Sequence, residues 1–212
     1  MKLIYLSTLV VVLLQCQIAK AQKDNLTAAE NPENWSVYNR EVSFNNKVIH
    51  LDAQQGDGLL WLKSSSFTNG NIELDIKGKN APGQSFVGIA FHGQDNSTFD
   101  GIYFRPFNFK NPERNSHSVQ YIAMPDNDWS ALRNAYPGKY ENSVQPVPNP
   151  DDWFHATIEI QYPIVKVYVN GSSTPTLEIK QISNRQTGKV GLWVGNGSEG
   201  WFKNIQFNSN AN

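Results

Sequence analysis

The sequence predicts an all-β sandwich of two antiparallel sheets, and three observations support that prediction. Apolar and polar residues alternate strictly over 154–161 and again over 165–170, which is the pattern of strands with one buried face. Turn-forming residues recur about every 8–12 positions, so roughly ten to twelve short strands are expected. No long stretch has helical periodicity. Strands that are apolar on one face need a second sheet to cover it, which makes a sandwich the expected fold.

The two alternating stretches form a hairpin in this prediction. The first has four apolar residues on one face: Phe154, Ala156, Ile158 and Ile160. Tyr162-Pro163 interrupts the alternation, because proline has no N–H for a strand ladder. The second stretch ends at Asn170-Gly171, a pair typical of turns.

The remaining strands are expected in chain order around this hairpin. Trp35 to Tyr38 is expected to dock on the body, and Asn45-Asn46 to form the first turn. Strands are expected over 42–52, 58–63, 70–77, 86–92, 99–107, 117–124, 176–182, 189–194 and 201–207. The sandwich therefore spans 42–207, after a polar segment at 22–41 and before a short tail at 208–212.

The segment from Pro125 to Asp152 breaks this pattern. It has little alternation and many Pro, Asn and Asp residues, and only Ser130 to Asn134 suits a helical turn. Loops longer than about 15 residues without regular structure are uncommon in compact domains unless they serve a function. We expect this loop to lie over one end or face of a sheet.

The first 21 residues have the features of a cleaved signal peptide. A positive Lys2 precedes an apolar run over 3–14, which is shorter than the roughly twenty residues that span a bilayer. Ala19-Lys20-Ala21 fits a cleavage site, so a secreted or periplasmic protein starting at Gln22 is expected. The alternatives are a membrane anchor and a lipoprotein, the latter less favoured because Gln15 precedes Cys16 where a small residue is usual.

The composition of the mature chain narrows the classes of partner. Cys16 is the only cysteine, so no disulfide or thiol chemistry remains after cleavage. Without Lys2 and Lys20 the 18 basic residues become 16 against 19 acidic, a net charge of about −3, which gives no basic surplus for nucleic acid or anionic lipid. Aromatic rings beside many neutral amides suit carbohydrate, because a sugar has apolar ring faces and a rim of hydroxyls.

Three stretches resemble a known superfamily. They are Trp153-Phe154-His155 with Val167-Tyr168-Val169-Asn170, then 188–195 (Gly-Lys-Val-Gly-Leu-Trp-Val-Gly), then 201–205 (Trp-Phe-Lys-Asn-Ile). The pattern resembles concanavalin A-like lectins and glucanases, and more narrowly the laminin-G-like and 3-keto-disaccharide-hydrolase-like domains of secreted bacterial proteins. The resemblance covers 42–207 and implies a jelly-roll sandwich of two curved antiparallel sheets, with ligands on the concave face or its rim.

One motif of the glucanases in this superfamily is incomplete. Their retaining members carry Glu-x-Asp-x-x-Glu, but here Glu73 and Asp75 are followed by Gly78 in place of the third carboxylate. Two carboxylates on one strand face lie about 7 Å apart, within the separation of glycosidase pairs. The alternative is a solvated strand face with Lys77 balancing the charge.

The strongest candidate for a binding surface is the polar face of the central strands. If Ile102 and Phe104 point into the core, Tyr103 and Arg105 point to the opposite face. By the same alternation Gln120 and His92 fall on that face. Their donors, acceptors and ring suit a polyol. The alternative is a convex solvent face on which Arg105 caps an acidic neighbour.

The long loop supplies the second set of candidates. Trp129, Arg133 and Glu141 lie in this segment without a strand role, together with Tyr136 and Tyr140. An exposed tryptophan is costly unless it packs or binds. The alternative is that these aromatic residues fix the loop to the sheet.

Catalysis and metal binding have weaker support. The candidate acids and bases are Glu73, Asp75, His92 and Glu141. Loop Asp and Asn residues leave calcium open as a cofactor, but none has the spacing of a known calcium loop, and the four scattered histidines give no zinc set. No metal ligand and no other cofactor is therefore assigned.

The sequence favours a secreted carbohydrate-binding module whose ligand contacts Tyr103, Arg105, Gln120, Trp129 and Arg133. The first alternative is a hydrolase or lyase of the 3-keto-disaccharide hydrolase type, acting on glycosides or 3-keto-glycosides. The second is a protein-interaction module of the laminin-G type. The glycan, its linkage and the oligomeric state stay open.

Overall fold

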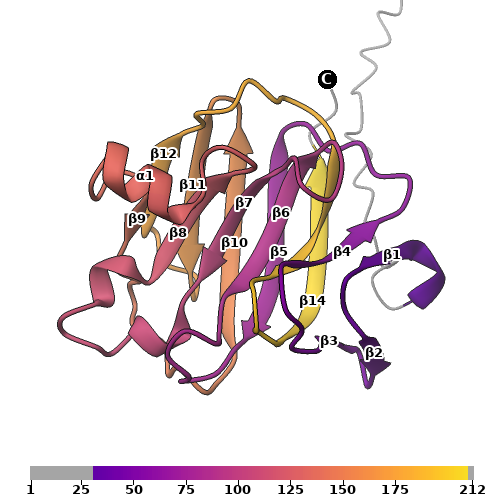
Figure 1. The fold of residues 1–212 in the computed structure, drawn as a ribbon, viewed down its shortest axis with the longest axis horizontal. Helices are drawn as coiled ribbons and strands as arrows, with labels where there is room; N and C mark the ends of the chain where they lie inside the picture. Colours follow the sequence, from indigo (N-terminus) through magenta and orange to yellow (C-terminus); the bar gives the residue numbers. More distant parts are fainter. Residues whose placement is uncertain (1–30, 210–212) are drawn as a thin grey trace, which may run out of the picture.

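The computed structural model describes residues 31–209 and has two seven-stranded antiparallel sheets packed face to face (Figure 1). We call them the first and the second sheet. The first sheet has the order β1 (Trp35–Tyr38), β4 (Gly58–Leu62), β13 (Lys189–Val194), β6 (Val87–Gly93), β7 (Asp100–Phe104), β8 (Val119–Ala123) and β9 (Glu141–Asn142). The second has the order β12 (Leu177–Lys180), β11 (Ile164–Val169), β10 (Phe154–Gln161), β5 (Gly70–Lys77), β14 (Gly200–Ser209), β3 (Val48–Leu51) and β2 (Val42–Asn45). The predicted all-β sandwich is confirmed.

The second sheet has the alternation that the sequence predicts. Along β5 and β10 every other residue is buried, and the residues between them are partly exposed. The register places Ile158 between Ile72 on one neighbour and Val167 on the other, and all three side chains are fully buried. One face of this sheet therefore packs in the core and the other faces solvent.

The central strands of the first sheet are buried on both faces. Strands β4, β6, β7 and β8 are buried along their whole length. One set of side chains enters the core between the sheets, among them Leu60, Ile89 and Ile102. The other set forms a second apolar cluster on the outer face: Leu59, Trp61, Ala90, Phe99, Tyr103, Ile122 and Trp193. Something other than the second sheet must therefore cover this outer face.

Part of that cover comes from the long segment between Pro125 and Asp152. Helix α1 (Trp129–Ala135) is capped at its N-terminus by Asp128, whose Oδ1 accepts a hydrogen bond from Ala131 N at 2.7 Å. The helix packs beside β8, with Leu132 buried (Figure 1). The segment then adds β9 to the edge of the first sheet. The expectation of a loop over the sheet holds, but the loop contains a seven-residue helix and a short strand.

Two boundaries differ from the sequence prediction. Strand β1 lies in the segment expected to precede the sandwich, yet it pairs with β4, so the first sheet already begins at Trp35, after the turn η2 (Pro32–Asn34). The strand expected over 99–107 ends at Phe104, because Pro106 begins the 3₁₀ turn η3 (Pro106–Asn108). A second 3₁₀ turn, η4 (Asn115–His117), leads into β8. These turns build one wall of the site described below.

The described part of the chain contains no helix that is long and apolar enough to cross a membrane. The predicted signal peptide and most of the tail lie outside the described residues.

Candidate functional site

Arg105 is the centre of a polar cluster on the outer face of the first sheet. It follows β7, and its side chain is only 5% exposed. One guanidinium nitrogen donates to the carbonyl of His117 at 2.9 Å, and the other donates to the hydroxyl of Tyr103. Both also lie 3.4–3.5 Å from Gln120 Oε1. The strand register explains the cluster, because Tyr103 is paired directly with Gln120.

Glu141 is the carboxylate of this cluster. Strand β9 pairs it with Gln120, and it is buried. Arg133, reaching from α1, donates two hydrogen bonds to it, Nε to Oε1 at 2.8 Å and a terminal nitrogen to Oε2 at 2.5 Å. His117 Nδ1 lies 2.9 Å from Oε2, within ion-pair distance. Burial acts to raise the pKa of Glu141, but Arg133 and His117 outweigh it and lower that pKa.

Arg105 shares the negative charge of Glu141 with Arg133 and His117. Its nearest guanidinium nitrogen lies 3.9 Å from Glu141 Oε2, beyond hydrogen-bond distance. Burial lowers the pKa of Arg105, and the charge of Arg133 acts in the same direction. The three groups that Arg105 binds are all neutral acceptors.

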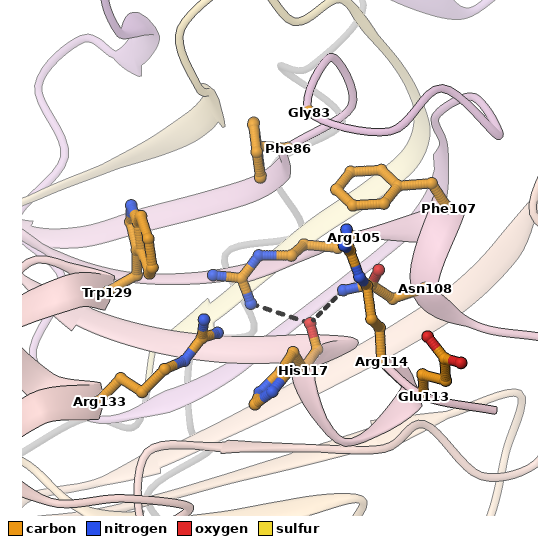
Figure 2. Close-up of a pocket in the computed structure, with 10 residues that line it drawn as sticks. All are labelled: Gly83, Phe86, Arg105, Phe107, Asn108, Glu113, Arg114, His117, Trp129 and Arg133. Carbon is orange, nitrogen blue, oxygen red and sulfur yellow. Dashed lines mark hydrogen bonds between the residues drawn. The ribbon is translucent and has the colours of Figure 1, made fainter. Parts of the chain in front are cut away.

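A cavity of about 500 Å³ opens above this cluster (Figure 2). Its aromatic walls are Phe86, Phe107 and Trp129, and its polar lining is Arg105, Asn108, Glu113, Arg114, His117 and Arg133. The ring of Trp129 is 46% exposed, with the guanidinium carbons of Arg133 and Arg105 at 5.0 and 5.9 Å from its centroid. An exposed indole beside a set of fixed donors is the composition of a site for a polar ligand with an apolar face.

A smaller cavity of about 200 Å³ adjoins the first and shares Phe86 and Trp129 with it. Its other lining residues include Asp57, Tyr103 and Trp193. The indole N–H of Trp193 donates to Asp57 Oδ2 at 3.3 Å, and burial raises the pKa of that aspartate. We refer to the two cavities together as the groove.

The structure brings together most of the residues that the sequence assigned to binding. Tyr103, Arg105 and Gln120 share one face, as the alternation predicts, and Trp129, Arg133 and Glu141 join them from the long segment. However, Tyr103 is 2% exposed and Gln120 is 1% exposed. In the large cavity these two side chains lie behind Arg105 and position it, instead of lining the cavity as expected.

Three predicted catalytic candidates lie elsewhere. The ring of His92 faces Thr68, whose carbonyl oxygen is 2.6 Å from Nε2, and not Arg105. The reason is a bulge: Gly93 pairs with Lys189 but Ala90 with Gly191, so β6 has one extra residue, and His92 takes a φ of 49°. Glu73 and Asp75 are on the solvent face of the second sheet, where Asp75 binds His155 and Asn204.

Several lining residues were not singled out from the sequence. They are His117, Arg114, Asn108, Phe86 and Phe107. The stretch Pro106-Phe107-Asn108-Phe109 is unusual for a strand. Its proline indicates that the chain turns there, and this turn forms one wall of the large cavity. His117 and Arg114 stand in an irregular polar segment that gives no periodic signal.

Among residues 31–209 no three His, Cys, Asp or Glu side chains lie together as ligands for a metal ion.

A family comparison adds to this geometry. Residues 22–208 match the model of the 3-keto-alpha-glucoside-1,2-lyase-like domain. The chain belongs to this family. The match spans the whole sandwich and confirms the narrower resemblance seen in the sequence. No curated protein sequence matches the chain.

Solved structures with the same fold include carbohydrate-binding proteins. The carbohydrate-binding module CBM66 from Bacillus subtilis superposes with a TM-score of 0.60 at 14% identity, covering 81% of this chain and 93% of that chain. The VIP36 exoplasmic/lumenal domain, bound to Ca²⁺ and Man3GlcNAc, gives 0.58 at 12% identity, covering 84% and 85%. The Emp46p carbohydrate recognition domain gives 0.54 at 14% identity, covering 86% and 91%. At these identities the likeness shows the fold, a concanavalin A-like sandwich.

Proposed function

We propose that this protein binds a carbohydrate in the groove on the outer face of its first sheet. The observation that carries the proposal is the exposed Trp129 ring beside the buried, fixed guanidinium of Arg105 in a cavity of about 500 Å³. A sugar ring stacks on an indole through its C–H face and receives hydrogen bonds at its rim. A volume of this size suits one or two sugar units.

Rigid positioning supports the same proposal. Arg105 is held by three neighbours from β7, η4 and β8, and Arg133 is held by two hydrogen bonds to Glu141. Donors that are fixed before the ligand arrives lose little conformational entropy on binding. The three solved structures named above point the same way: one is a carbohydrate-binding module, one is bound to Man3GlcNAc, and one is a carbohydrate recognition domain.

The test compares two tryptophans on opposite sides of the molecule. A glycan array with the full-length mature protein identifies a ligand, and calorimetry then measures its affinity for Trp129→Ala and for the control Trp153→Ala. Trp153 precedes β10 of the second sheet and lies under Lys203, whose Nζ is 4.3 Å from its ring centroid. Loss of a stacking ring is expected to weaken binding by roughly ten- to a hundredfold for Trp129→Ala, and the control is expected to bind normally.

Equal affinities of the two variants would move the site away from the groove. An array without any bound saccharide, at protein concentrations up to the millimolar range, would refute carbohydrate binding itself.

One observation favours a second candidate function, a lyase acting on 3-keto-glucosides. His117 lines the cavity, and its Nδ1 lies 2.9 Å from the buried carboxylate of Glu141, so a carboxylate flanks one ring nitrogen. A ketone at C3 acidifies the proton on C2. In this reaction His117 takes that proton and the C3 ketone becomes an enolate. The enolate then returns to the ketone as a C1–C2 double bond forms, the C1–O bond breaks with its electron pair on the departing oxygen, and that oxygen receives a proton from water. Arg105 is placed to stabilise the enolate oxygen.

The lyase has its own matched pair of variants. His155 has a carboxylate partner at a similar distance, with its Nδ1 2.8 Å from Asp75 Oδ1, but it stands on the second sheet. Release of the aglycone from a 3-keto-glucoside is expected to fall by about a hundredfold or more in His117→Gln and to stay unchanged in His155→Gln. No release by the parent protein, or equal rates in the two variants, would refute this assignment.

We also propose that the chain works outside the cytoplasm after removal of residues 1–21. N-terminal sequencing of the exported protein tests this proposal, with Gln22 expected as the first residue and Met1 as the contradictory result.

A further inference from the structure

The groove is built for more than a neutral sugar. We infer, on the basis of the carbohydrate-binding proposal, that its ligand is an acidic saccharide, whose anionic group, a carboxylate or a sulfate, sits against Arg105 and Arg114.

The first reason is that Arg105 has to share its carboxylate partner. A buried guanidinium is costly unless a negative group compensates it. Among residues 31–209 the one carboxylate that forms an ion pair with Arg105 is Glu141, which makes its hydrogen bonds with Arg133 and lies 3.9 Å from Arg105. Arg105 makes hydrogen bonds only with the neutral oxygens of Tyr103, Gln120 and His117. An anion in the cavity would give the pair of guanidinium groups a second negative charge, so that Arg105 no longer has to share Glu141 with Arg133.

The second reason is the excess of cations at this end of the groove. Arg105, Arg114 and Arg133 line the large cavity, and the only acidic lining residue is Glu113. Arg114 is exposed, and its side chain makes no hydrogen bond or ion pair with any residue of the described chain. It is therefore available to a ligand without breaking an existing interaction. Figure 2 shows it beside Asn108, across the cavity from Trp129.

Asn108 supplies a neutral contact next to these cations. Its amide nitrogen donates to the His117 carbonyl at 3.1 Å, but its buried Oδ1 accepts no hydrogen bond within residues 31–209. A buried acceptor without a partner is destabilising, and a ligand hydroxyl would satisfy it. A sugar that carries an anionic group and a neighbouring hydroxyl would pair with both the arginines and Asn108.

The adjoining small cavity has the opposite character. Asp57 and Asp128 line it together with the rings of Trp129 and Trp193. An anion is disfavoured there, so the ligand has a direction: its charged unit lies in the large cavity, and a neutral unit lies in the small one. The ring of Trp129, which lines both cavities, stands between the two units.

The experiment begins with an array of neutral, uronate-containing and sulfated oligosaccharides, probed with the mature protein at low and at physiological salt. The best acidic binder is then compared by calorimetry with its own neutral counterpart, carboxyl-reduced for a uronate or desulfated for a sulfate. The acidic form is expected to bind about tenfold or more tightly, with a preference that decreases as salt is added. The treatment that removes the preference, carboxyl reduction or desulfation, identifies the anionic group.

Two variants locate the charge recognition. Arg114→Gln, an exposed change that leaves the fold intact, is expected to remove most of the preference for the acidic form. Lys166→Gln, which removes a cation from the solvent face of the second sheet, is the control and should keep it.

The outcomes separate this inference from the proposal beneath it. Equal binding of the acidic and the neutral form, or binding of neutral saccharides alone, overturns the inference and leaves carbohydrate binding standing. The absence of any bound saccharide overturns both. An acidic preference that Arg114→Gln leaves untouched overturns the assignment to this cavity.

Discussion

The two sheets of this sandwich differ most in their outer faces. On the second sheet the outward residues form isolated ion pairs and hydrogen bonds at the surface, such as His155 with Asp75 and Lys166 with Glu178. On the central strands of the first sheet the outward residues are buried. They form an apolar cluster around Trp193, and the buried polar residues beside it include Arg105, Gln120 and Glu141.

This difference indicates where the function lies. A sheet that needs only solubility leaves its polar side chains in water, because exposed ion pairs cost little to form or to lose. Burying charged groups on an outer face is expensive and needs support from additional segments. The helix α1, the strand β9 and the turns η3 and η4 provide that support, and the groove lies among them.

The largest effect should appear when one outward-facing side chain of each sheet is truncated to alanine. Ile122 is 3% exposed in the outer cluster of the first sheet, whereas Thr157 is partly exposed on the second. Ile122→Ala is expected to lower the free energy of unfolding by about 2–4 kcal/mol, and Thr157→Ala by less than about 0.5 kcal/mol. Chemical denaturation measures both. Equal losses would show that the outer face of the first sheet is no more buried than that of the second.

A smaller loss of folding stability is expected when one carboxylate on each sheet is replaced by its neutral amide. Glu141→Gln leaves Arg133 and Arg105 without a nearby negative charge, and should cost about 1–3 kcal/mol of folding stability. Asp75→Asn breaks a partly exposed pair with His155 and should cost less than about 1 kcal/mol. Urea unfolding of the two variants gives the comparison, and a larger loss for Asp75→Asn would contradict it.

The smallest effect is a dependence of stability on acid. The pKa of Glu141 is lower in the folded protein than in the unfolded chain, so its contribution is fully present above the unfolded value and is lost as the pH falls through the folded one. Stability of the parent protein should therefore decrease below about pH 4 more steeply than that of Glu141→Gln. Parallel curves of melting temperature against pH would show that Glu141 is not held ionised by its neighbours.

The same contrast explains how much the sequence alone predicts. The strands of the second sheet could be predicted from the alternation of apolar and polar residues, because the outward residues of this sheet are polar. Residues 154–161 and 164–169 form strands almost as expected. Alternation also placed Tyr103, Arg105 and Gln120 on one face, since no bulge interrupts β7 or β8. It failed for His92, because a bulge of one residue turns that side chain away and no sequence pattern announces it.

The walls of the groove were harder to predict for another reason. His117, Arg114 and Asn108 belong to short 3₁₀ turns or to the segment between them, whose side-chain directions depend on tertiary contacts and not on a period. The burial of Gln120 and Tyr103 was also hidden, because it comes from Arg105 lying over them and from the segment that contains α1 and β9.

The central claim, that carbohydrate binds on the first sheet, is tested most directly by the indole N–H signals of the six tryptophans in a nuclear magnetic resonance titration with the glycan found on the array. Trp129 and Trp193 line the groove, whereas Trp153 and Trp201 lie on the side of the second sheet. We expect saturable shifts for Trp129 and Trp193 and stationary signals for Trp153 and Trp201. Shifts confined to Trp153 or Trp201, with Trp129 unmoved, would contradict the assignment of the groove as the binding site.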